Sequence, residues 1–163
     1  MTQVMTTRES RITVRMTSIW LIIASLSAQA SPPSTLVQAL SGRHGVQDCR
    51  ALSAYSDTLQ ADLLRVVEEV KLPPWAPMNA AICLIEEHPA ASRNALLGWV
   101  QHPEQGGLAR LVFRRLERFS EETALDVMQH ALDGPHQQEA LVATQADKRE
   151  AVRALRPRTP PVR

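Results

Sequence analysis

The sequence predicts an all-α protein, and the prediction rests on composition and on apolar spacing. Aromatic residues are scarce, with two Phe, three Trp and one Tyr in 163 residues. The core must therefore be built from Leu, Val, Ile and Ala in a chain rich in helix-forming residues. Apolar residues also recur at the three- and four-residue spacing of a helix face, between proline and glycine breaks. The length suits one domain.

The first 30 residues have the pattern of a secretory signal peptide. A polar segment with three arginines comes first, and an apolar run at 19–26 follows. The small residues Ala28 and Ala30 predict cleavage between Ala30 and Ser31. A membrane anchor or a buried N-terminal helix is the alternative, but the apolar run supplies about half of the roughly 20 residues that a span needs. We expect a periplasmic or secreted protein that meets the membrane only during export.

Export gives a meaning to the two cysteines, Cys49 and Cys83. An even number of cysteines in an oxidising compartment favours a disulfide. A bond between them closes a loop of about 35 residues, which in the chain-entropy model stabilises the fold by about 4 kcal/mol. Two buried free thiols are the alternative.

The N-terminal part of the mature chain is expected to alternate between loop and helix. We interpret residues 31–47 as a linker with one helical turn at 35–40, followed by Asp48 as the N-cap of a helix. Helical spacing then continues to residue 70, and the polar residues 56–58 predict a break within it, with one long helix as the alternative. Prolines at 73, 74 and 77 end this region.

Trp75 lies among these prolines. Because tryptophan is mostly buried in folded proteins, we expect its ring to pack over the helix ends. An exposed aromatic side chain that docks a partner is the alternative.

Residues 77–102 are the clearest helical hairpin in the sequence. Pro89 interrupts the pattern, and Ser92 is a suitable N-cap for the second helix. The first helix has an apolar stripe of Met78, Ala81, Ile82 and Ile85, and the second has Leu96, Trp99 and Val100. Two short helices with one apolar face each predict an αα-hairpin.

The C-terminal half predicts three further segments. Gly106 and Gly107 precede an apolar stripe from Leu108 to Phe119, and Ser120 is the predicted N-cap of a helix that stops at 133–135. A last helix at about 135–155 and a disordered tail at 157–163 complete the chain. The other side of the 108–119 segment carries four arginines, which we interpret as a solvated face paired with nearby glutamates rather than an anion site: Arg110, Arg114, Arg115 and Arg118.

Apolar positions repeat along the chain. Leu63, Leu64 and Val67 recur 33 residues later as Leu96, Leu97 and Val100. Helix pairs at 48–71, 77–102 and 107–133, inside a predicted domain at 48–156, resemble the short HEAT-type α-solenoids. The resemblance implies about three stacked hairpins plus a C-terminal helix, with a Cys49–Cys83 bond between the first two. An irregular α-helical bundle is the alternative.

The sequence contains no recognisable catalytic motif or phosphate-binding loop. The chain after residue 30 has 15 basic and 16 acidic residues, so it lacks the excess of positive charge that is typical of nucleic-acid-binding proteins. We therefore expect no enzymatic activity and no cofactor. The leading prediction is an exported monomeric scaffold that binds another, unidentified protein. The alternative is a small periplasmic metal- or ligand-binding protein, with weak candidate ligands in Glu86, Glu87, His88 and His102.

Overall fold

The structure is a computed structural model that describes residues 31–158. The predicted leader at 1–30, with Ala28 and Ala30, and the last residues of the predicted tail, 159–163, lie outside the described residues. Within the described range every regular element is a helix, and there is no strand. The all-α prediction is confirmed.

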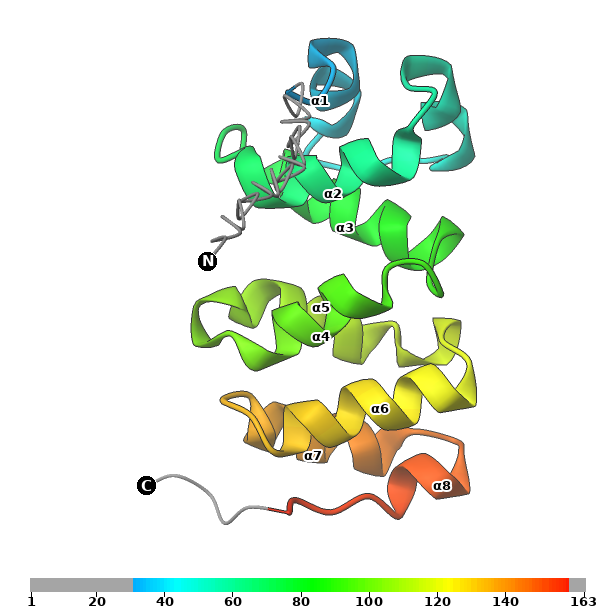
Figure 1. Cartoon of the computed structure of the whole chain (residues 1–163), viewed down its shortest axis with the longest axis vertical. Coiled ribbons are helices and arrows are strands. Elements are labelled where there is room, and N and C mark those ends of the chain that lie inside the picture. Colours follow the sequence, from blue (N-terminus) through cyan, green and yellow to red (C-terminus); the bar gives the residue numbers. More distant parts are fainter. Residues whose placement is uncertain (1–30, 159–163) are drawn as a thin grey trace, which may run out of the picture. The chain divides into compact units, whose positions relative to one another are not determined.

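Short helices and 3-10 turns follow one another with brief connections (Figure 1). The α-helices are α1 (Ser34–Leu40), α2 (Leu59–Glu69), α3 (Trp75–Glu87), α4 (Arg93–Gln101), α5 (Gly106–Arg114), α6 (Glu121–Leu132), α7 (Gln137–Ala146) and α8 (Glu150–Arg153). The 3-10 turns are η1 (Arg50–Tyr55), η2 (Pro103–Gln105) and η3 (Leu116–Arg118).

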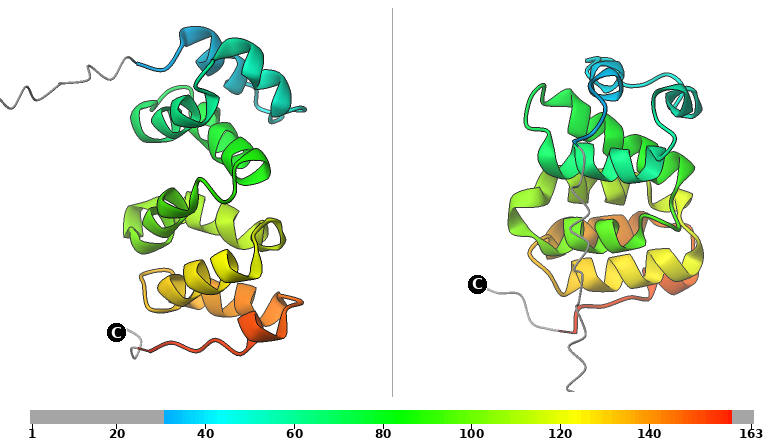
Figure 2. Two further views of the ribbon diagram at one scale, coloured as in Figure 1. Left: turned by 45° about the vertical axis from the view of Figure 1, so that its right-hand side comes forward. Right: turned by 45° about the horizontal axis from the view of Figure 1, so that its top comes forward.

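The longer helices pack as pairs in two layers. Helix α2 packs against α3, α4 against α5, and α6 against α7. Within the layers, α4 packs against α6, and α5 lies between α3 and α7 (Figures 1 and 2). At one end α1 packs against α3, and at the other α8 packs against α6 and α7.

The predicted hairpin at 77–102 is wrong in its pairing. Its two helices exist as α3 and α4, with a break that includes Pro89, but α3 packs against α2 and α5 rather than α4. The connections before and after α3 are both about five residues long. Loop length therefore does not decide which helix packs against α3. The apolar side chains of α3 contact more than one helix, namely α1, α2 and α5.

Several predicted helix boundaries are confirmed. The break at 56–58 separates η1 from α2, and the prolines at 73 and 74 separate α2 from α3. Ser120 caps α6, because its Oγ accepts a hydrogen bond of 3.2 Å from the backbone N–H of Thr123. Ser92 precedes α4 as predicted but makes no side-chain cap, so that part of the prediction is wrong.

The last helix predicted at 135–155 is divided. Helix α7 ends at Ala146, and α8 starts at Glu150. The intervening turn is held by Asp147, whose Oδ1 accepts a hydrogen bond of 2.8 Å from the backbone N–H of Arg149. The predicted stripe from 108 to 119 is divided as well, since α5 ends at Arg114 and η3 follows.

The predicted linker at 31–47 contains part of the core. Helix α1 lies within it, and Leu36 and Leu40 are fully buried. Asn79 of α3 fixes the end of α1, since its Nδ2 donates hydrogen bonds of 2.8 and 2.9 Å to the carbonyl oxygens of Leu40 and Gly42. The folded region therefore begins before the predicted boundary at residue 48.

A disulfide joins Cys49 and Cys83, as predicted. It connects the start of η1 to the middle of α3, and the two Cα atoms are 5.3 Å apart. Both residues are buried. The bond is compatible with an oxidising compartment.

Aliphatic side chains and alanine fill the core, as the composition predicts. Fully buried alanines allow neighbouring helices to approach closely. They are Ala76, Ala80, Ala81, Ala109, Ala124, Ala131 and Ala140. Across residues 31–158, none of the helices is both long and apolar enough to cross a membrane.

Candidate functional site

The four weak metal candidates are not brought together. Glu86 forms an ion pair with Arg115, and the Oε2 atom of Glu87 accepts a hydrogen bond of 3.0 Å from the Nε of Arg50. Both carboxylates therefore connect α3 to neighbouring segments.

The two histidines of this set end different helices. His88 follows α3, and its backbone N–H donates to the carbonyl oxygen of Leu84 at 2.9 Å. His102 follows α4, and its Nδ1 lies 3.5 Å from the Oε1 of Glu104 on the surface. Over the described range, no three side chains of His, Cys, Asp or Glu gather to hold a metal ion.

Trp75 is not the buried plug that we expected. Its side chain is 41% exposed, and the guanidinium carbon of Arg43 lies 5.7 Å from the ring centroid. At this distance the cation interacts with the ring face. Trp75 thus keeps an accessible part of its surface, and Leu72, three residues earlier in the chain, is 79% exposed.

A larger exposed surface runs along α5, between α3 and α7. It consists of two adjacent hollows, which we together name the α5 groove. The first, about 360 Å³, is lined by Arg110, Phe113, Arg114, Gln138, Glu139, Val142, Ala143 and Ala146. The second, about 460 Å³, is lined by Met78, Ile82, Gly107, Arg110, Leu111, Arg114 and Arg115.

Helical spacing explains why these side chains share a face. Arg110 and Arg114 are four residues apart on α5, so they lie one above the other, at the boundary that the two hollows share. On α7, Val142 and Ala146 have the same separation. Val142 is 62% exposed, and among residues 31–158 the other large apolar residues with exposed side chains are Tyr55, Leu72 and Trp75.

The arginines of the α5 groove differ in their ion pairing. Arg115 pairs with Glu86, and the Nη1 of Arg110 lies 3.5 Å from the Oε1 of Glu139. Arg114 has no ion-pair partner among residues 31–158, so the groove carries a surplus positive charge there. The sequence interpretation of a solvated face paired with nearby glutamates is therefore correct only in part, because two of the arginines pair, and their partners Glu86 and Glu139 lie on other helices.

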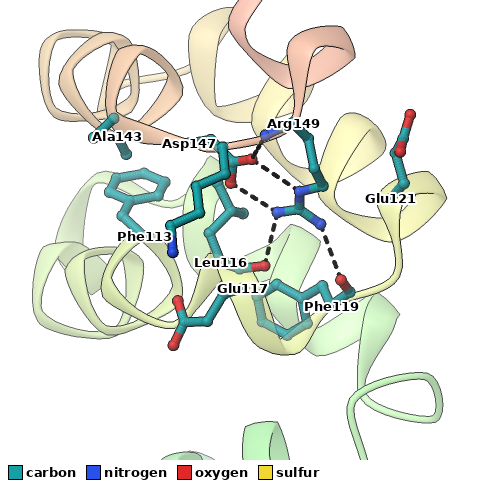
Figure 3. A pocket seen from close by; sticks show the side chains of 10 residues that line it. Phe113, Leu116, Glu117, Phe119, Glu121, Ala143, Asp147 and Arg149 are labelled. Carbon is teal, nitrogen blue, oxygen red and sulfur yellow. Dashed lines mark hydrogen bonds and ion pairs between the residues drawn. The ribbon is translucent and has the colours of Figure 1, made fainter.

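A third hollow, which we name the Arg149 pocket, adjoins the α5 groove through Phe113, Ala143 and Ala146. Its volume is about 590 Å³. Figure 3 shows the side chains that line it. Its lining is Phe113, Leu116, Glu117, Phe119, Glu121, Ala143, Ala146, Asp147, Lys148 and Arg149.

Arg149 holds the wall of this pocket together. Its Nη1 and Nη2 donate hydrogen bonds of 3.0 and 2.9 Å to the carbonyl oxygens of Phe119 and Leu116. Its Nε and Nη2 also donate to the carboxylate of Asp147, at 2.9 and 2.8 Å (Figure 3). The hydrogen bonds from Arg149 hold the pKa of Asp147 below its usual range. The guanidinium is therefore occupied by the protein itself, unlike that of Arg114.

The sequence offered only partial signals for the α5 groove. The i,i+4 spacing of Arg110 and Arg114 and the isolated large apolar residue Val142 in an alanine- and glutamine-rich helix are visible in it. The position of α7 next to α5 is not, because it depends on how the helix pairs stack.

Comparison with models of known protein families found no match, and neither curated protein sequences nor solved structures gave one.

Proposed function

We propose that this protein is an exported, non-enzymatic helical scaffold that binds another protein. The observation that carries the proposal is the α5 groove, built from side chains of α3, α5 and α7. It is an apolar surface with one arginine, Arg114, that has no ion-pair partner within residues 31–158. Exposed apolar patches with polar rims are characteristic of binding surfaces. The longer helices pair in two layers, and stacked helix pairs can present an extended face to a partner.

Two features support export. The leader pattern at 1–30 predicts a mature chain that begins at Ser31, and the Cys49–Cys83 disulfide suits an oxidising compartment. The metal-binding alternative receives less support, because Glu86 and Glu87 are engaged in ion pairs.

Affinity capture tests the proposal. The full chain with a C-terminal tag is expressed in a host that secretes disulfide-bonded proteins, and the processed protein is captured from the exported fraction after mild crosslinking. We expect a mature N-terminus at Ser31 and one or a few co-captured proteins at molar yields comparable to that of the bait. Retention of the leader would contradict export. A monodisperse monomer with no co-captured protein would contradict the scaffold function.

A further inference from the structure

We infer that the α5 groove binds an acidic segment of a partner protein, in which one carboxylate lies between two large apolar side chains. This inference rests on the proposed function and adds the site and the chemistry of the partner.

Arg114 is a positively charged residue at the boundary between the two hollows. It lines both hollows and has no ion-pair partner in the described part of the chain, whereas Arg110 and Arg115 pair with Glu139 and Glu86. A guanidinium presents parallel N–H groups that match the two oxygens of a carboxylate. Arg114 is therefore the cation of the groove that remains free to bind a carboxylate.

The two hollows that Arg114 lines both expose apolar side chains. The first places Val142 and Ala143 of α7 next to Phe113. The second places Met78 and Ile82 of α3 next to Leu111. Val142 is exposed, and Phe113, Met78 and Ile82 are partly exposed, so each hollow can bury an apolar side chain of an incoming segment. Such apolar contacts supply affinity, and a charge pair between them supplies specificity and register.

The charges around the α5 groove favour a protein segment over other anionic ligands. A phosphate-rich ligand requires several free cations, and the neighbours of Arg114 are already paired with carboxylates. The mature chain also has 15 basic and 16 acidic residues, which gives no general attraction for nucleic acid. Two apolar hollows that share one arginine without an ion-pair partner in the described range, Arg114, fit a polypeptide that alternates apolar and acidic side chains.

Peptide selection tests the inference. The mature protein, residues 31–163, is used to select from a displayed library of random 12-residue peptides, and the enriched sequences are read. We expect an Asp or Glu flanked on both sides by large apolar residues. Enrichment of basic or uncharged apolar sequences, or no enrichment, would overturn the inference.

Matched variants then locate the contact. The affinity of a selected, fluorescein-labelled peptide is measured by anisotropy against the wild type, Arg114→Glu and Arg118→Glu. Both arginines are exposed and lack ion-pair partners in the described part, but only Arg114 lines the groove. We expect about a tenfold loss for Arg114→Glu, since an attractive exposed pair becomes repulsive, and less than about a twofold loss for Arg118→Glu. A peptide with Lys in place of its acidic residue should prefer the Arg114→Glu protein.

A second pair of variants, at Val142 and Gln145 of α7, tests the apolar contact. Val142→Asp should weaken binding at least as strongly as Arg114→Glu, whereas Gln145→Asp, an exposed α7 position outside the hollows, should leave it nearly unchanged. Equal losses in both members of either pair would show a nonspecific effect and overturn the inference. If light scattering shows a dimer that Val142→Asp dissociates, the groove is instead an interface between two copies. A protein captured equally by wild type and Arg114→Glu would leave the scaffold function intact and refute this site.

Discussion

Arg149 shows how much one side chain contributes to the C-terminal region. It donates to two backbone carbonyls about 30 residues upstream and to Asp147 two residues before it. These contacts attach the turn between α7 and α8 to η3 and to the residue after it. They also form the wall of the Arg149 pocket, so that arginine is structural rather than available to a ligand.

Substitution of Arg149 should therefore destabilise the fold. Arg149→Ala leaves the carbonyls of Leu116 and Phe119 without their side-chain donor and Asp147 without its cation, which we expect to lower the free energy of unfolding by about 2–3 kcal/mol. Urea denaturation measures the change. Lys148→Ala is the control, since this neighbour is exposed and has no ion-pair partner among residues 31–158, and it should change stability by less than about 0.5 kcal/mol. Equal effects of the two substitutions would contradict the role given to Arg149.

The lowered pKa of Asp147 makes the free energy of unfolding depend on pH. Hydrogen bonds from Arg149 lower the pKa of this carboxyl in the folded state, while in the unfolded chain it titrates at about 3.9. The stability that the Asp147 carboxylate contributes is therefore fully present above the pKa of the unfolded state, and it is lost as pH falls through the pKa of the folded state. Asp147→Asn should reduce stability by a constant amount between about pH 5 and 7, and the difference from wild type should shrink below about pH 4. A difference that grows in acid would contradict this assignment.

The disulfide attaches the short turn η1 to helix α3. This turn packs against α1 and α2, and the Cys49–Cys83 disulfide joins its start to α3. The bond closes a loop with a sequence separation of 34, so it restricts the unfolded chain and also holds the N-terminal segment on the helix pair α2 and α3.

Removal of the disulfide should loosen this end of the protein first. We expect Cys49→Ala/Cys83→Ala to lower the free energy of unfolding by about 4 kcal/mol. Hydrogen exchange should accelerate in η1 and α1 more than in α6, which lies in a different helix pair. A reductant should have no effect on the double variant. An unchanged melting temperature of the wild type after reduction would contradict the bond.

The helix boundaries were largely predictable, and the packing was not. Pro73, Pro89 and the Ser120 cap act within a few residues of their own position, so the sequence reveals them directly. The division of α7 from α8 has no proline or glycine signal. Asp147 holds the turn locally, and Arg149 also donates to the carbonyls of Leu116 and Phe119, a contact that the sequence does not reveal. The pairing of α3 with α2 likewise follows from packing rather than from loop length.

The candidate site was less predictable still. The sequence directed attention to Glu86, Glu87, His88 and His102 because they lie close together in sequence or on one predicted hairpin. The structure uses both glutamates for ion pairs and does not assemble the four as a metal site. The α5 groove instead combines Met78, Arg114 and Val142 from three helices, which only the tertiary structure brings together.

At the scale of the whole molecule, the two layers of paired helices explain how short elements form the α5 groove. Helix α5 lies between α3 and α7, so one face of three helices is continuous (Figure 2). The apolar residues of that face are left partly exposed while the core behind it is filled with alanine and leucine. The proposed scaffold function relies on this arrangement.

Site-specific photocrosslinking tests the central claim most directly. A photoreactive amino acid at position 142 should yield one discrete adduct in the exported fraction, and the crosslinked peptide should contain an acidic residue between apolar residues. The same probe at Gln145 serves as the position control. Arg114→Glu should strongly reduce the yield of the adduct from position 142, and Arg118→Glu should preserve it. Equal adduct yields in both variants, or no adduct from position 142 in the wild type, would contradict the claim that the α5 groove binds a partner protein.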